Sequence, residues 1–158
     1  MIQGAALLAL LVAGVPAAAR PVSVRYLTPE RFTDAENRLG SGQSLRVTLS
    51  EMTRIFEDLG RRLPPGDSLA VNVLDIDLAG YERPGVGLPQ SVRVVQDFTP
   101  PRIRLAYSLR RKGRVVAQGE DTVTDINFMQ AANPRFSAGG LYYERAVLRD
   151  WFARRFGT

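Results

Sequence analysis

The chain has 158 residues and a formal net charge of +5, and it contains neither cysteine nor histidine. This composition excludes disulfide bonds, thiol nucleophiles, zinc sites with nitrogen or sulfur ligands, and Ser-His-Asp triads. It also excludes the lipid anchor of exported lipoproteins, which is attached to a cysteine. The commonest general base near neutral pH is missing with histidine. A Ser-Lys pair would have to use Lys112, the single lysine, which we expect on an exposed hairpin tip. Carboxylates are therefore the main candidates for catalysis, and we expect no cofactor.

The first 19 residues have the pattern of an export signal. They carry no charged side chain, contain an apolar run at residues 5–13, and end in a Pro-Ala-Ala-Ala sequence with small residues where signal peptidase cuts. The run is shorter than the roughly 20 apolar residues of a membrane-spanning helix. A buried N-terminal helix is the alternative, but the segment has no polar face. We predict a signal peptide at residues 1–19, a mature domain at 20–158, no transmembrane anchor, and a periplasmic or secreted location.

One strand and one helix are predicted next. Residues 21–27 alternate apolar with other side chains, which indicates a strand that ends at a Thr-Pro pair. From residue 45 to residue 63, apolar side chains recur at spacings of three and four, which lines one face of a helix. Either Thr48, in a capping box, or Ser44 begins the helix. A Pro-Pro-Gly sequence at residues 64–66 ends it.

The second predicted strand, residues 69–79, changes its pattern partway along. Its apolar residues fall into two sets of opposite parity, which are Leu69, Val71 and Val73, then Leu74, Ile76 and Leu78. A β-bulge near Val73 would bring both sets to one side of the sheet. Burial on both faces, as in a central strand, is the alternative. A Gly/Pro-rich loop is predicted at residues 80–89, and a short strand at 92–98.

The clearest predicted element is a β-hairpin around Gly113. Apolar residues alternate with others before this glycine, at Ile103, Leu105, Tyr107 and Leu109, and the return strand is predicted from Arg114 to about Thr124. A two-residue turn would set Leu105 opposite Glu120, which pairs a core position with a charge. A three-residue loop at 111–113 instead sets Arg104 opposite Glu120. It favours a left-handed residue at its third position, where Gly113 stands. We therefore predict this loop, with a positive φ at Gly113.

A last helix is predicted at residues 141–156, with its apolar side chains on one side. Tyr142, Tyr143, Trp151 and Phe152 could form a binding platform, but their helical spacing favours the core. Together these elements predict an α+β fold. It is a single two-layer domain with a mostly antiparallel sheet of about four to five strands, two helices on one face, and the other face polar and open. The side chains expected in the core are Leu49, Phe56, Leu105, Tyr107, Leu148 and Phe152.

Asp75 and Asp77 are the first candidate site. They stand two residues apart on the predicted second strand, so their Cα atoms would lie about 6.6 Å apart on one face. Such a pair could provide the acid and base of a glycosidase-like hydrolase, or bind a metal ion through oxygen atoms. The alternative is a ladder of ion pairs on the open face. Its cationic members would be Arg102, Arg104 and Arg110.

A second acidic group consists of Glu120, Asp121 and Asp125. The predicted register places Asp121 on the core side of the sheet, opposite Ile103. There it could cap a loop or pair with an arginine of the last helix. The candidate binding residues of the open face are therefore Asp75, Asp77, Arg102, Arg104 and Glu120.

Several stretches of the chain follow the pattern of one family, namely residues 26–34, 62–66, 75–80, 102–105, 119–125, 143–145 and 150–152. Together they resemble the bacterial domain-of-unknown-function family numbered 3016, over essentially the whole mature chain. Pro100 stands where the family pattern has an aromatic residue, Phe128 where it has Tyr, and Arg145 where it has Lys. The resemblance implies an exported proteobacterial-type protein, and it carries no activity with it.

The sequence thus favours a non-catalytic envelope binding or accessory module that uses the open sheet face or a sheet edge. A carboxylate-based hydrolase or oxygen-ligand metal protein centred on Asp75 and Asp77 is the alternative. Arginines on the same face would lower the pKa of both carboxyls, whereas a general acid needs a raised pKa. The expected partner is an envelope protein or ligand. Nucleic acid is not expected, because the chain has no basic stripe studded with aromatic residues.

Overall fold

The computed structural model describes residues 21–37, 44–84, 91–131 and 140–157. The predicted signal peptide and half of the predicted Gly/Pro-rich loop, residues 85–89, lie outside these residues. Within the described part of the chain, no helix is long and apolar enough to cross a membrane.

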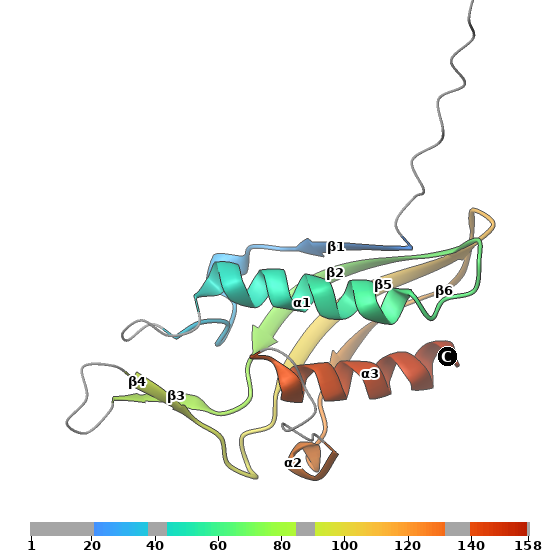
Figure 1. Ribbon diagram of the computed structural model, residues 1–158. Helices are drawn as coiled ribbons and strands as arrows, with labels where there is room; N and C mark the ends of the chain where they lie inside the picture. The colour runs from blue at the N-terminus through green and yellow to red at the C-terminus, as the bar shows by residue number, and fades with distance from the viewer. Residues whose placement is uncertain (1–20, 38–43, 85–90, 132–139, 158) are drawn as a thin grey trace, which may run out of the picture.

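Four strands form the main sheet in the order β1-β2-β5-β6 (Figure 1). They are β1 (Val22–Tyr26), β2 (Asp67–Asp77), β5 (Arg102–Arg111) and β6 (Arg114–Val123). β1 pairs with β2 in parallel, and the other neighbours are antiparallel. A separate two-stranded ribbon consists of β3 (Tyr81–Pro84) and β4 (Ser91–Val94). The predicted α+β fold is confirmed. β3 occupies part of the region predicted as a loop.

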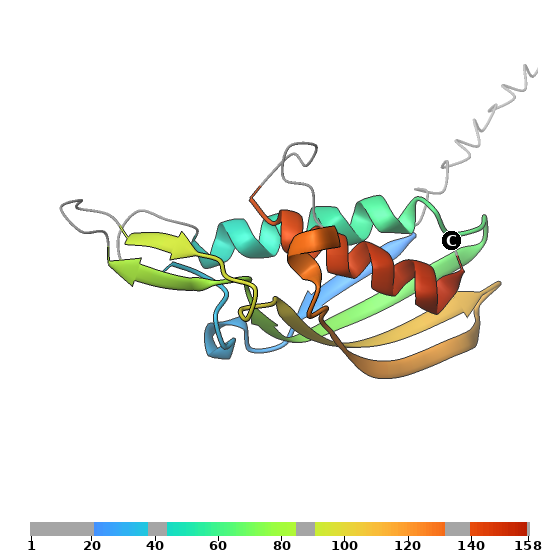
Figure 2. The same cartoon turned by 90° about the horizontal axis from the view of Figure 1, so that it is seen from below.

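Two helices, α1 (Leu45–Gly60) and α3 (Tyr142–Phe156), lie on one face of the main sheet (Figure 2). The short helices η1 (Pro29–Arg31) and α2 (Phe128–Ala131) lie in the connections. The core between the two layers is closed by side chains with no exposed surface, such as Phe56, Leu105 and Phe152. Five of the six side chains predicted for the core are buried, and Leu49 is only partly buried.

Helix α1 begins where one of the two predicted caps stands. The Ser44 hydroxyl accepts a hydrogen bond from the Val47 backbone N–H at 3.4 Å, so Ser44 is the N-cap. The helix ends at Gly60, earlier than predicted, although Leu63 beyond it is still buried. A Cβ atom at residue 60 would collide with the side chain of Val22, so the glycine lets α1 approach β1 closely.

The predicted bulge in β2 is confirmed. Val73 lies opposite Leu105, whereas Asp75 lies opposite Arg104, so Leu74 is the extra residue. Five of the six apolar residues of this strand segment are buried, and Leu74 is only half-buried. The bulge therefore keeps the core side continuous and turns Asp75 to the open face.

The predicted hairpin register is wrong by two residues. The turn is a two-residue turn at Lys112 and Gly113, with φ angles of 50° and 81°, both positive as such hairpins require. A bulge at Val116 then restores the parity, so Arg104 lies opposite Thr122. The ion pair between Arg104 and Glu120 therefore runs diagonally between the two strands. The predicted positive φ of Gly113 is confirmed.

Candidate functional site

Asp75 lies on the open face of β2, opposite Arg104, but its carboxylate serves the chain itself. One oxygen accepts a hydrogen bond from the Thr33 backbone N–H at 2.8 Å, and the other accepts one from the Thr33 hydroxyl at 2.7 Å. The loop that follows β1 is thereby fastened to the bulge of β2. Both carboxylate oxygens of Asp75 have protein donors, so the group is already engaged.

Asp77 lies opposite Arg102 on the same strand pair. Burial raises its pKa above the ordinary value, and the nearby Asp34 adds to the rise, because two carboxylates disfavour each other's charge. The charge of Arg102 acts to lower the pKa of Asp77, but by less than burial and Asp34 raise it. The prediction that arginines would lower the pKa of both carboxyls is therefore wrong for Asp77. Desolvation and the Asp34 charge outweigh the arginine.

Arg102, Arg104 and Glu120 lie exposed on the open face. Arg104 forms a long ion pair with Glu120, 3.6 Å from Nε to Oε1, with both side chains more than half exposed. Exposed pairs of this kind contribute little stability. Among the described residues, no three acidic side chains converge in a way that could hold a metal ion.

Asp121 pairs with an arginine of α3, one of the two roles considered for it. Arg155 donates two hydrogen bonds of 2.7 Å and a third of 3.0 Å to this carboxylate. The Trp151 indole N–H donates another at 2.8 Å. Asp121 therefore fixes the end of α3 on β6, opposite Leu105 and not opposite Ile103.

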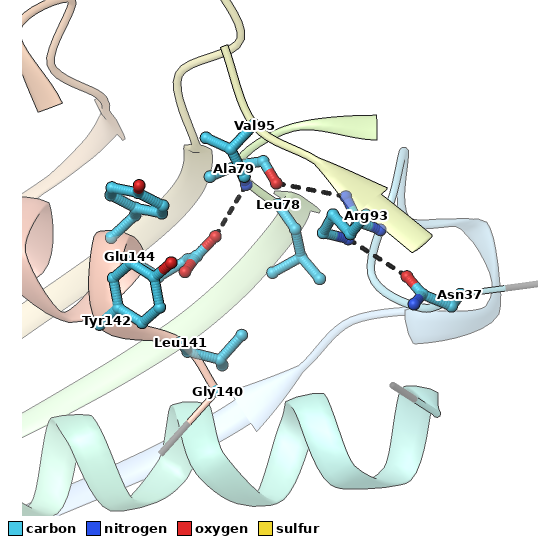
Figure 3. A pocket seen from close by; sticks show the side chains of 10 residues that line it. Asn37, Leu78, Ala79, Arg93, Val95, Gly140, Leu141, Tyr142 and Glu144 are labelled. Carbon is cyan, nitrogen blue, oxygen red and sulfur yellow. Dashed lines mark hydrogen bonds between the residues drawn. The ribbon is translucent and has the colours of Figure 1, made fainter. Parts of the chain in front are cut away.

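A pocket of about 280 Å³ lies elsewhere, where the end of β2, strand β4 and the start of α3 meet (Figure 3). Leu78, Val95 and Leu141 provide apolar walls, and the ring of Tyr142 stands beside the carboxylate of Glu144. No local pattern in the sequence predicts this pocket, because its residues come from segments far apart in the chain.

Glu144 is the most unusual group in this pocket. Its residue surface is only 3% exposed, and its Oε1 accepts a hydrogen bond from the Ala79 backbone N–H at 2.8 Å. Burial raises the pKa of Glu144, while hydrogen bonds from the backbone N–H groups of Ala79 and of Glu144 itself act in the lowering direction. A perturbed carboxyl group in a pocket is a typical feature of binding and catalytic sites.

Arg93 lines the same pocket, and its charge acts to lower the pKa of Glu144, but its nitrogens are bonded to other groups. Arg93 donates to both oxygens of Asp34, at 2.8 and 2.9 Å, and its Nε–H donates to Asn37 at 3.2 Å. It also reaches the carbonyl oxygens of Ala79 and Gly80. Within the described ranges, Glu144 has no arginine or lysine at ion-pair distance. The pocket therefore contains a buried carboxylate with hydrogen bonds but, among the described residues, without a direct ion pair, because the cation that lines the pocket is bound to Asp34.

One signal in the sequence could have identified Glu144. It precedes Val147, Leu148 and Trp151 by three, four and seven residues, so it lies on the apolar side of the last helix. A carboxylate on that side must be buried, and buried carboxylates need partners. Of the proposed aromatic platform, Trp151 is buried in the core, whereas Tyr142 lines the pocket.

A family profile described as "Protein of unknown function (DUF3016)" matches residues 20–154. No curated protein and no solved structure matches the chain.

Proposed function

The chain belongs to the DUF3016 family, whose description names no activity, and we propose that it is an exported, non-catalytic binding module of the cell envelope. We place its ligand site in the Glu144 pocket. The observation that carries this proposal is the carboxylate of Glu144, which is 3% exposed, lines a pocket and forms no ion pair among the described residues, since the pocket's Arg93 is bound to Asp34.

The chemistry of the pocket favours a small ligand with an amine and an apolar body. Removing a carboxylate from water is costly unless a cation or several hydrogen bonds replace the lost hydration. The Ala79 N–H supplies one such bond. A bound ammonium group would give Glu144 a direct ion-pair partner, while the walls at Leu78 and Leu141 would cover the apolar part of the ligand.

The hydrolase alternative has one point in its favour, the raised pKa of Asp77, which is the direction a general acid needs. It also requires a second free carboxylate nearby. Asp75 is the strand neighbour available for that role, and Thr33 already donates to both of its oxygens. We therefore prefer the binding module, and we place the ligand away from the open sheet face.

Benzylamine is a suitable probe, because it combines an ammonium group with a ring that the pocket can cover. We expect it to shift the amide resonances of Ala79 and Glu144 in a nitrogen–proton correlation spectrum. The neutral analogue benzyl alcohol should shift them far less. The Glu144→Gln variant keeps an oxygen for the Ala79 N–H but loses the charge, so it should lose the response to benzylamine.

Glu120→Gln provides the matched control, because it removes an exposed carboxylate remote from the pocket. This variant should bind benzylamine like the wild type. Equal responses to the amine and the alcohol, or an undiminished response in Glu144→Gln, would contradict the proposed site.

Export is tested separately. The mature protein should begin near residue 20, which N-terminal sequencing of protein from a periplasmic extract would reveal. Recovery of the chain only from the cytoplasm, with its first methionine retained, would refute the envelope location and leave the ligand proposal intact.

A further inference from the structure

The positive charge of the chain is concentrated at one end of the domain. We call this the basic end: the last turn of α1 and the loop after it, the start of β2, the β5–β6 turn, and the last turn of α3 (Figures 1 and 2). Two interactions join these segments, a hydrogen bond from the Lys112 N–H to the Gly66 carbonyl at 3.1 Å and the Arg111–Asp67 ion pair at 2.9 Å. Its cationic residues, all exposed, are Arg61, Arg62, Arg110, Arg111, Lys112, Arg114, Arg154 and Arg155.

Four acidic residues accompany these eight cations, namely Glu57, Asp58, Asp67 and Asp121. The basic end thus holds four of the five net positive charges of the chain. The remaining thirteen cationic and twelve acidic residues nearly cancel. Several cations of the basic end have no carboxylate partner among the described residues, and three of them surround the β5–β6 turn: Arg110, Lys112 and Arg114.

Apolar side chains lie directly beside these free cations. Val115 and Val116 follow Arg114 in β6 and are 45% and 51% exposed. The bulge at Val116 interrupts the regular pairing at this point. Cations that can reach phosphate groups, next to exposed aliphatic side chains, are the combination that favours the interface of an anionic bilayer.

The direction of the chain also indicates that the basic end is the part of the domain that faces a bilayer. Pro21, the first described residue, leads into β1 from the basic end (Figure 1). The apolar run at residues 5–13 lies a few residues upstream in the sequence. On the proposed export route that run enters the membrane before it is cleaved, so the end of the domain that it joins emerges beside the bilayer.

We propose that the basic end docks the domain onto an anionic phospholipid bilayer. The Glu144 pocket lies at the opposite end, where α3 begins, so a docked domain would direct its pocket away from the lipid (Figure 1). This inference goes beyond the proposed ligand site and does not depend on it.

The test is vesicle flotation of the chain from residue 20 to residue 158, which contains every described element. Circular dichroism verifies that it is folded. It should float with phosphatidylcholine vesicles that contain about one third phosphatidylglycerol, and not with phosphatidylcholine alone. Because the contact is electrostatic, raising the salt from about 0.05 to about 0.5 M should release most of it.

Two charge-reversal variants with equal net charge separate a specific surface from a general effect of charge. Arg110→Glu with Arg114→Glu alters the turn of the basic end and should weaken binding at least about tenfold. Arg46→Glu with Arg83→Glu alters exposed residues at the far end and should weaken it by less than about threefold. Replacing Val115 and Val116 by Ser should also weaken binding, with less dependence on salt.

Equal flotation with neutral and anionic vesicles would overturn the proposal, and so would equal losses in the two charge-reversal variants. A short DNA duplex, at the same phosphate concentration and salt, tests whether nucleic acid is an equally good polyanionic partner. If the duplex binds as tightly and loses the same affinity in the Arg110/Arg114 variant, the bilayer is not the specific partner.

Discussion

The two ends of the domain hold similar arginine–aspartate pairs in different surroundings. At the pocket end, Arg93 binds Asp34 through two nitrogens, and the two side chains are 18% and 25% exposed. At the basic end, Arg155 binds Asp121 through Nε and Nη2, and the two side chains are 44% and 20% exposed, so the arginines differ in burial more than the aspartates do. The pocket end also buries Glu144, whereas the cations of the basic end face solvent.

This difference shows that burial, more than residue type, determines what a charged side chain contributes. A buried charge has lost its hydration, so removing its partner leaves an uncompensated group. An exposed charge stays hydrated, and salt screens it. We therefore expect the pocket end to respond strongly to mutation, and the basic end to respond mainly to salt.

The largest effect is expected for Phe56→Ala, which removes a fully buried ring from the core that both ends share. The loss should be about 3–5 kcal/mol of unfolding free energy, because the transfer of the ring and the remaining cavity both contribute. Denaturant unfolding should be followed by Trp151 fluorescence near the basic end and by the Ala79 amide resonance at the pocket end. Separate midpoints for the two probes would mean that the ends are independent units.

A sharper comparison uses the two matched ion pairs. Arg93→Ala should cost about 2–3 kcal/mol, because it leaves Asp34, Asn37 and two carbonyl groups without donors in a partly buried place. Arg155→Ala should cost about 1 kcal/mol or less, because that arginine is more exposed. Thermal unfolding at low and high salt measures both. Equal losses would show that burial does not distinguish these pairs.

Two glycines with the same backbone angle test steric surroundings at the two ends. Gly80 and Gly113 both have φ of 81°. A Cβ atom at Gly80 would collide with the Val94 carbonyl, whereas nothing lies within 4 Å of one at Gly113. Gly113→Ala should therefore cost about 1 kcal/mol from the backbone alone, and Gly80→Ala about 2 kcal/mol. A smaller loss for Gly80→Ala than for Gly113→Ala in urea unfolding would contradict this packing.

The smallest expected effect is a change in pH dependence in Glu144→Gln. The pKa of Glu144 is raised in the folded state, so the folded protein takes up a proton more readily than the unfolded chain. The resulting stabilisation is complete below the ordinary pKa of glutamic acid and is lost as pH rises through the folded pKa. Glu144→Gln lacks this dependence, so its stability relative to the wild type should rise between acidic and mildly alkaline pH. A constant difference in midpoint temperature between the variant and the wild type across that range would argue against a raised pKa of Glu144 in the folded protein.

Local patterns predicted several elements because their causes are local. The stripe of apolar residues that includes Met52, Phe56 and Leu59 identified α1, since one face of a helix must be buried. The change of parity between Val73 and Leu74 identified the bulge, since a strand can keep one side buried only by inserting a residue. Such inferences require only the spacing of side chains along the chain.

The hairpin register shows where local patterns stop being sufficient. Registers that differ by two residues keep every side chain on the same face, so alternation cannot choose between them. The contacts of Lys112 with Gly66 and of Arg111 with Asp67 hold the short turn against the start of β2. The bulge at Val116 then restores the apolar side.

The sequence by itself determined the kinds of chemistry available, since a chain without cysteine or histidine is left mainly with carboxylates, arginines, one lysine and hydroxyl groups. Only the tertiary structure decided which carboxylates lie where a ligand could reach them. The Asp75 carboxylate accepts hydrogen bonds from a threonine in the loop after β1. The Glu144 carboxylate instead accepts one from a backbone N–H 65 residues away, at the wall of a pocket. The reason is physical: the state of a charged group depends on the water and the dipoles around it, and those come from segments that folding brings together.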